Sequence, residues 1–289
     1  MRRTVLMLGM AAMAAAVLPM AASAGPGNMA HSSRPAVQSA RPFTLGGTPC
    51  RLIGVPAADT NLPVGIGTCP GVRPGGEVQT EQGLCTLNFL FVTPEGERFI
   101  GTAGHCIVGE GPVADNAGEK TWAKGTGPAA KDAAGTRFGE FAYAVLQDPK
   151  DFALIRLDPG VEASPEMCNY GGPTGINDDI SDGPQVLQYF GNGVGIGSTV
   201  PARSAVSMGF PNADHVYAAG LALPGDSGSA VITDDGRAVG VLVTTGLHGL
   251  GFDENGVDFG TMGITRISPQ IARASQALGL QFTMVTVGK

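Results

Sequence analysis

Residues 84–106 read LCTLNFLFVTPEGERFIGTAGHC and give the clearest secondary-structure signal in the chain. The first part, Leu84–Val92, is apolar and rich in aromatic and β-branched residues, as is typical of a β-strand. Residues 93–97 (TPEGE) contain proline and glycine and predict a turn. Arg98–Cys106 begins as a second strand and runs into a loop. This part of the chain is therefore predicted to be β structure.

The remainder of the chain continues the same pattern. Strand-like segments follow at irregular spacing, with turn residues between them: 136–146, 152–157, 185–190, 215–223, 230–233, 238–245 and 259–267. The 45 glycines and 21 prolines argue against a helical bundle. Only Ser268–Leu278 predicts a helix, with Ser268 as its cap and Gly279 at its end. The sequence thus predicts an all-β sandwich or barrel with one C-terminal helix.

The charge of the chain excludes two classes of partner. Its 18 Lys and Arg against 25 Asp and Glu give a net charge of −7, and no basic run occurs. Nucleic acids and anionic membranes attract proteins through basic patches, so neither is an expected partner. The charged fraction is only 15%, which excludes a typical disordered chain.

The N-terminus has the features of a secretory signal peptide. Arg2 and Arg3 precede an apolar stretch, and residues 22–24 (ASA) fit a small-x-small cleavage site. Residues 1–24 are therefore the predicted signal, and 25–45 are predicted to be a flexible leader or short pro-segment. No later segment has about 18 uninterrupted apolar residues, so we expect a secreted protein without a membrane anchor.

Secretion changes how the five cysteines are interpreted. Outside the cytoplasm cysteines are expected to pair, and an odd number leaves one over. A zinc site is the alternative, but the chain has no CxxC or HExxH spacing and its histidines are scattered. We therefore expect disulfide bonding and neither a metal nor a cofactor.

Three short segments contain the residue types of nucleophilic catalysis. In chain order they are 102–106 (TAGHC), 151–155 (DFALI) and 225–229 (GDSGS). A serine hydroxyl needs a base to take its proton, and histidine is the natural base near neutral pH. A buried carboxylate can fix the imidazole tautomer. His105, Asp151 and Ser227 supply these three side chains. Gly225 allows backbone N–H groups to face a developing oxyanion.

Each of these residues also has a simple structural explanation. His105 alone fits a structural histidine, Asp151 a turn or cap residue at the start of a strand, and GDSGS an ordinary turn. All three in this order in one secreted, β-rich chain form a far more specific pattern. On these motifs the sequence resembles the chymotrypsin-like (trypsin-fold) serine proteases, especially their secreted bacterial branch, over about residues 80–280.

The resemblance implies a particular fold. It implies two antiparallel six-stranded β-barrels with the active site between them and a C-terminal helix. The protease domain is then 46–289. Its first barrel spans about residues 80–157, its crossover 158–184, and its second barrel with the helix 185–289.

The resemblance also implies a role for each motif residue. His105 is expected to be the general base and acid, Asp151 its orienting carboxylate, and Ser227 the nucleophile. The N–H groups of Gly225 and Ser227 are expected to form the oxyanion hole. Asp226 needs a partner, which could be a freed N-terminus, an internal arginine or backbone donors, so the need for activation by cleavage stays open.

The family also suggests how the cysteines pair. Cys106 adjoins the expected base, and Cys85 stands where the family has its partner, so a Cys85–Cys106 disulfide is expected. Cys50–Cys69 is a second hypothesis that leaves Cys168 unpaired. Either of these N-terminal cysteines could instead pair with Cys168.

The residues around the expected specificity pocket are mostly apolar. Trypsin-like members have an aspartate six residues before the nucleophile, and here that position is Leu221. Thr244, Thr245 and Gly263 are expected to form the opposite wall. We therefore predict cleavage after uncharged apolar residues rather than after Lys or Arg. Because His248 is near in sequence, a preference for acidic residues stays an alternative.

The resulting hypothesis is a monomeric secreted endopeptidase that acts on proteins or peptides through an acyl-enzyme. A catalytically silent trypsin-fold binding protein and a zymogen that needs cleavage are the alternatives. An α/β-hydrolase esterase is disfavoured, because Ser229 stands where its G-x-S-x-G elbow has a glycine.

Overall fold

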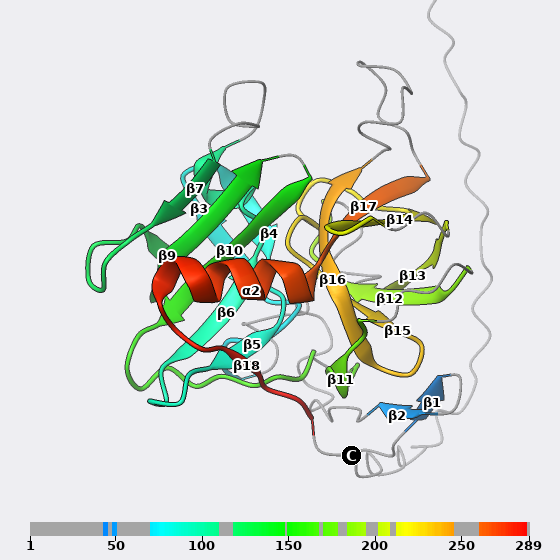
Figure 1. Cartoon of the computed structure of the whole chain (residues 1–289), viewed down its shortest axis with the longest axis horizontal. Helices are drawn as coiled ribbons and strands as arrows, with labels where there is room; N and C mark the ends of the chain where they lie inside the picture. The colour runs from blue at the N-terminus through cyan, green and yellow to red at the C-terminus, as the bar shows by residue number, and fades with distance from the viewer. Residues whose placement is uncertain are drawn as a thin grey trace, which may run out of the picture. The chain divides into compact units, whose positions relative to one another are not determined.

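The computed structural model describes residues 43–45, 48–50, 70–109, 118–147, 149–167, 170–178, 184–194, 202–208, 212–245 and 260–287 (Figure 1). All of them belong to the second of two compact units, Val37–Lys289. The predicted signal peptide lies outside the described residues, as does nearly all of the predicted leader. Strands β1 (Phe43–Leu45) and β2 (Thr48–Cys50) pair with each other as a short antiparallel ribbon.

The first large sheet is antiparallel and follows the order β18-β5-β6-β10-β9-β8-β3-β4, with β7 added beside β9. It forms a half-barrel. Its strands are β3 (Glu77–Thr80), β4 (Gly83–Thr86), β5 (Leu90–Val92), β6 (Arg98–Thr102), β7 (Gly118–Thr121), β8 (Ala129–Lys131), β9 (Arg137–Gln147), β10 (Lys150–Leu157) and β18 (Thr283–Met284).

The second large sheet closes into a six-stranded barrel. Its order is β16-β15-β12-β13-β14-β17, and pairing of β16 with β17 completes the ring. Short β11 joins β16 as a parallel pair outside the ring. The strands are β11 (Gly175–Ile176), β12 (Val186–Phe190), β13 (Ala202–Ser207), β14 (His215–Gly220), β15 (Ala230–Thr233), β16 (Arg237–Thr245) and β17 (Thr261–Arg266). The predicted all-β, two-barrel architecture is therefore confirmed, with a half-barrel as its first part.

The predicted strand Leu84–Val92 is divided in two. Strand β4 ends at Thr86 and β5 begins at Leu90. Between them the Asn88 side chain accepts a hydrogen bond from the Phe89 N–H at 2.7 Å, which takes that donor out of the ladder. Backbone bonds of Asn88 and Phe89 to Gly101 still hold this segment beside β6.

The two sheets share one hydrophobic core. Buried aromatic side chains of β9 and β10 pack together with residues of β15 and β16 in a single cluster, and the second barrel has a further cluster inside it. Strand β9 is buried over nine consecutive residues, as expected for a strand covered on both faces. The shared core is what keeps the loops of the two sheets together.

The C-terminal helix α2 (Ile267–Leu278) follows the second barrel but packs on β9 and β10 of the half-barrel as well as on β16 (Figure 1). Its residue Ile267 lies in the shared core. The chain then returns to the half-barrel, where β18 pairs with β5. The expectation that residues 185–289 belong to the second barrel therefore misses this return.

The ends of α2 agree only in part with the prediction. Gly279 stops the helix in the left-handed conformation, with φ +66°, as expected. The predicted cap is wrong, because the N-cap residue is Arg266 and no side chain caps the helix. The hydroxyl of Ser268 instead hydrogen-bonds the Asp178 carboxylate.

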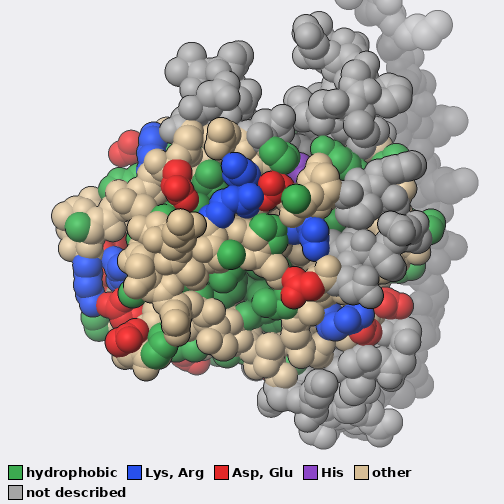
Figure 2. Space-filling view, in the orientation of Figure 1, with side chains coloured by type: hydrophobic (Ala, Val, Ile, Leu, Met, Phe, Trp, Pro, Cys, Tyr) green, Lys and Arg blue, Asp and Glu red, His purple; other side chains and the backbone are tan. Residues whose placement is uncertain are grey.

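The surface carries charged side chains of both signs. Lys and Arg side chains lie interspersed with Asp and Glu on the face in Figure 2, and exposed pairs such as Arg137–Asp158 are hydrogen-bonded. Of the helices in the described part of the chain, none combines the length and the apolar character that crossing a membrane requires.

Candidate active site

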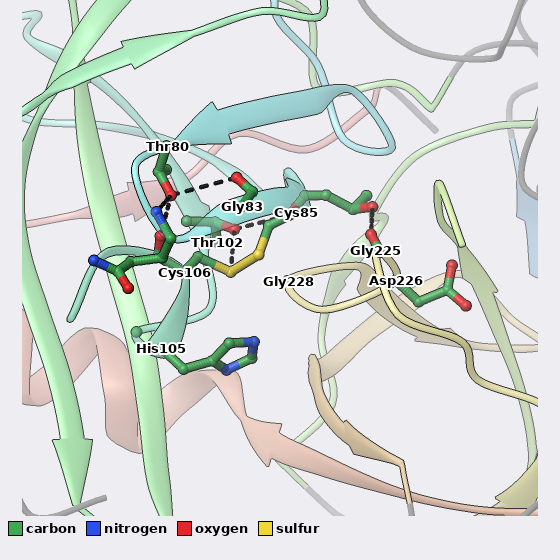
Figure 3. The surroundings of a disulfide bond; sticks show 12 residues. Thr80, Gly83, Cys85, Thr102, His105, Cys106, Gly225, Asp226 and Gly228 are labelled. Carbon is green, nitrogen blue, oxygen red and sulfur yellow. Dashed lines mark hydrogen bonds between the residues drawn. A yellow bond between two sulfur atoms is a disulfide. The ribbon is translucent and has the colours of Figure 1, made fainter. Parts of the chain in front are cut away.

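His105 begins the four-residue helix α1 (His105–Val108), and Ala103 and Gly104 separate it from the end of β6. A disulfide joins the next residue, Cys106, to Cys85 on β4, which is the pairing that the resemblance implied (Figure 3). The turn before His105 needs a glycine, because a side chain at Gly104 would overlap the carbonyl oxygen of Val145. The backbone that carries the imidazole is thus held against strands on two sides.

Asp151 lies near the start of β10 and takes part in three hydrogen bonds, two with His105 and one with Gly104. Its Oδ2 is 2.6 Å from Nδ1 of the imidazole. Its Oδ1 accepts the N–H groups of Gly104 at 2.5 Å and His105 at 3.0 Å. Both side chains are about nine-tenths buried. The carboxylate therefore orients the ring with a proton on Nδ1, and this tautomer presents its lone pair on Nε2.

The segment Gly225–Ser229 forms a tight loop before β15. Gly225 has φ +97° and Gly228 has φ +92°, which glycine adopts without strain. Within the loop the N–H of Ser229 donates to the Asp226 carbonyl at 3.0 Å. The side chain of Ser227 is half-buried at this loop. The two glycines thus let the backbone reverse direction around the serine.

Hydrogen bonds join this loop to the half-barrel. The N–H of Thr86 donates to the Ser227 carbonyl at 2.8 Å. The side-chain amide of Asn88 donates to the Gly228 carbonyl at 3.1 Å. Gly228 also lies so close to Thr102 that a side chain there would overlap its hydroxyl. The loop that carries Ser227 is therefore held against the strand that leads to His105, and in Figure 3 His105, the disulfide and Gly228 lie in one region.

Asp226 is completely buried and is neutralised by Arg203 from β13. The guanidinium donates to both carboxylate oxygens, at 2.6 Å to Oδ2. The N–H groups of Gly193 and Leu223 donate to the same carboxylate at 2.7 and 2.9 Å. The guanidinium also lies 4.8 Å from the centre of the Tyr189 ring. Asp226 thus has both an internal arginine and backbone donors as partners.

The expected pocket residues are described in part. Leu221 is 45% exposed, and its carbonyl accepts a hydrogen bond from the Tyr189 hydroxyl. Gly263 on β17 is paired in register with Thr244 on β16. The backbone therefore brings these two predicted wall residues side by side. The described part of the structure does not include His248 or the side chains of Thr244 and Thr245.

The predicted second disulfide also involves cysteines outside the described residues. Cys69 and Cys168 are not among the described residues, nor is the side chain of Cys50. Across the ranges that are described, one group of metal-ligand types comes together, Cys85, His105 and Cys106. Its two sulfurs are bonded to each other, so they cannot act as thiolate ligands.

Sequence reasoning missed Thr86, Asn88 and Arg203, which position the Ser227 loop. Thr86 and Asn88 are the two polar residues within the otherwise apolar run CTLNFLFV, and both are fully buried. A polar residue inside an apolar strand is a usable signal, because it must find a partner when buried. Arg203 gives no such signal in the sequence.

Comparison with known proteins gives matches only among solved structures. No family model and no curated protein matches the sequence. Thermobifida fusca Protease A is 18% identical, with 73% of this chain and 98% of that chain covered and a TM-score of 0.49. A glutamic acid-specific serine protease that uses a histidine triad in substrate binding is 18% identical, with 74% and 100% covered and a TM-score of 0.48. Cellulomonas bogoriensis chymotrypsin is 21% identical, with 74% and 98% covered and a TM-score of 0.46.

Proposed function

We propose that this protein is a secreted serine endopeptidase that cleaves proteins or peptides through an acyl-enzyme. The observation that carries the proposal is the buried Asp151 carboxylate, which binds Nδ1 of His105 and the backbone N–H groups of Gly104 and His105. The loop of Ser227 is hydrogen-bonded to the strand segment beside it. Asp151 thus orients the proposed base, and the proposed nucleophile lies on a loop that is hydrogen-bonded to the half-barrel that carries this base. Both observations support acyl transfer.

In this mechanism Nε2 of His105 takes the proton of the Ser227 hydroxyl as its Oγ bonds to the substrate carbonyl carbon. The carbonyl oxygen becomes an oxyanion, which the N–H groups of Gly225 and Ser227 stabilise. The C–N bond then breaks and His105 gives the proton to the leaving amine. Water repeats the sequence on the ester, so that the acid product leaves and Ser227 regains its proton.

Asp151 supplies the electrostatic part of this step. When His105 takes a proton, the imidazolium carries a positive charge inside a nearly closed site. The carboxylate at 2.6 Å offsets that charge and keeps the ring in one orientation. Because the backbone N–H groups of Gly104 and His105 bind its other oxygen, the carboxylate itself stays fixed.

Activation by cleavage is not required in this proposal. The acid before the nucleophile needs a buried cation, because an unpaired buried carboxylate is costly. Arg203 already supplies that cation, and two backbone N–H groups donate hydrogen bonds to the same carboxylate. No new N-terminus has to enter the site. We further propose a preference for apolar residues before the cleaved bond, because Leu221 stands where a basic-residue pocket has an acid.

A fluorophosphonate probe followed by peptide mapping tests the chemistry. We expect labelling at Ser227 in the processed protein, and its loss in S227A and H105A. The S227A variant should also lose hydrolysis by several orders of magnitude, on the order of 10⁶. No labelling of a folded wild-type sample would contradict the proposal and would favour a silent binding protein or a zymogen. A peptide library then separates apolar from acidic preference.

A further inference from the structure

The two peptide groups that flank Gly225 are each held by a hydrogen bond to their carbonyl. The Pro224 carbonyl accepts the N–H of Val194 at 2.8 Å. The Gly225 carbonyl accepts the hydroxyl of Thr86 at 2.7 Å. Both donors come from segments well separated from this loop in the sequence, and in Figure 3 a dashed line marks a hydrogen bond at Gly225.

The first bond fixes the direction of the Gly225 N–H. In a trans peptide the carbonyl and the following N–H point in opposite directions. Because Val194 holds the Pro224 carbonyl, the Gly225 N–H faces the other way. Gly225 at φ +97° has no side chain to resist rotation of these peptides, so their orientation depends on their hydrogen-bond partners. These are Val194 and Thr86 at the two carbonyls and, for the second peptide, the Leu223 carbonyl, which accepts the Asp226 N–H at 2.9 Å.

Thr86 is built into the site at three further points. Its hydroxyl accepts the N–H of Asn192 at 3.1 Å while it donates to Gly225. Its N–H binds the Ser227 carbonyl at 2.8 Å. Its carbonyl accepts the hydroxyl of Thr102 at 2.9 Å. Thr86 is fully buried, so it connects the strand leading to His105 with both residues expected to supply oxyanion donors.

We infer that the Thr86 hydroxyl, together with the Val194 N–H, positions the Gly225 N–H for the oxyanion, so Thr86 is a positioning residue of the reaction. The inference rests on the proposed function and adds a residue to it. A donor helps catalysis only when it is already aimed at the place where charge develops. Loss of the Thr86 hydroxyl removes the bond on the Gly225 carbonyl, so the Gly225–Asp226 peptide can tilt and turn the Gly225 backbone, and its N–H, away from the oxyanion. Such a change weakens binding of the tetrahedral state more than binding of the substrate.

The test compares Thr86→Val, which keeps the shape and removes the hydroxyl, with Thr86→Ser, which keeps the hydroxyl. We expect kcat of Thr86→Val to fall by roughly 10-fold to 10²-fold with little change in KM, less than the ~10²–10³ of losing a whole donor. Thr86→Ser should recover most of the activity. Thr265→Val is the matched control, because Thr265 is also fully buried and its hydroxyl binds one backbone carbonyl, that of Asp214.

A second measurement separates the tetrahedral state from ground-state binding. A peptide boronic acid forms a tetrahedral adduct on the serine, and we expect Thr86→Val to weaken its affinity by about the same factor as kcat. Binding of the uncleaved peptide, measured on S227A with and without Thr86→Val, should not change. A purely structural role would change both affinities together and would overturn the inference.

A backbone variant tests the other bond, also in case Thr86→Val does not fold. Val194→Pro removes the N–H donor, whereas Val194→Ala keeps it and changes only a side chain that is 67% exposed. We expect the proline variant alone to lose kcat. If wild type hydrolyses peptides and both Thr86→Val and Val194→Pro match their controls, the inference is wrong and the proposed function stands. A folded wild type that neither hydrolyses peptides nor binds the boronic acid overturns both.

Discussion

Arg203 and Asp226 form a buried ion pair that joins the loop Gly225–Ser227 to the backbone of Leu223, just before it, and of Gly193, in a separate segment. The carboxylate is fully buried and the guanidinium nearly so. Backbone N–H groups of Gly193 and Leu223 donate to the same carboxylate. The pair therefore stabilises the loop that carries the expected nucleophile, as well as the barrel in which it lies.

Removal of the arginine should therefore be costly. R203M leaves the Asp226 carboxylate buried with only its backbone donors, and we expect the free energy of unfolding to fall by about 3–5 kcal/mol. The matched control is R137M, which breaks the exposed Arg137–Asp158 pair and should cost less than ~1 kcal/mol. Denaturant unfolding of the three proteins gives the comparison. Equal stability of both variants would show that the buried pair contributes nothing.

Asp151 should matter for catalysis more than for stability. D151N keeps the shape of the side chain but removes its charge, and its amide can hold the imidazole in the wrong tautomer. We expect kcat to fall by about 10⁴. Thermal unfolding is the control, because a folded D151N protein with wild-type turnover would contradict the assigned role.

Gly228 should tolerate no side chain. In G228A a Cβ would overlap the Thr86 carbonyl oxygen and the Thr102 hydroxyl at φ +92°. We expect a loss of ~1–3 kcal/mol from the overlap in addition to ~1–2 kcal/mol from the backbone conformation. The control is G96A, because Gly96 has φ +83° and open space around it, so only the backbone cost applies. Activity should be lost in G228A alone, and equal unfolding free energies would refute the steric argument.

Tyr189 should make the fold sensitive to alkaline pH. Burial raises the pKa of its hydroxyl to about 12, against about 10 in an unfolded chain. The neutral form is therefore favoured by folding, and this contribution is complete below pH ~10 and lost as pH rises toward 12. Between these values the unfolding free energy of wild type should fall more steeply than that of Y189F. Parallel curves for the two proteins would contradict the raised pKa.

The Tyr189 hydroxyl should also contribute to stability below pH 10, through its hydrogen bond. Its hydroxyl donates to the Leu221 carbonyl, so Y189F leaves that carbonyl without this donor. We expect Y189F to be less stable than wild type by about 1 kcal/mol at neutral pH. Because Leu221 stands in the expected specificity pocket, the choice of residue before the cleaved bond should be measured in the same variant.

Local sequence determined many of the strands, though not β3, β7, β8 or β13, and it indicated the chemistry of the candidate site. Alternating turns and apolar runs predicted most of the strands, because strand formation depends on short-range patterns of burial and on glycine and proline. His105, Asp151 and Ser227 were selected as candidates for a similar reason, since each role in the proposed mechanism admits few residue types. The helix stop at Gly279 was correct because the left-handed conformation favours glycine, whereas the cap at Ser268 was wrong because a partner from another segment, Asp178, binds its hydroxyl.

Only the tertiary structure decided which distant groups meet. Thr86 and Val194 hold the Gly225 peptides, Arg203 neutralises Asp226, and β18 returns to the half-barrel. Each of these contacts joins segments that are well separated in sequence, and their position depends on how the two sheets close and share one core. The physical reason is that a residue's type limits which bonds it can make, while the packing of the sheets selects its partner.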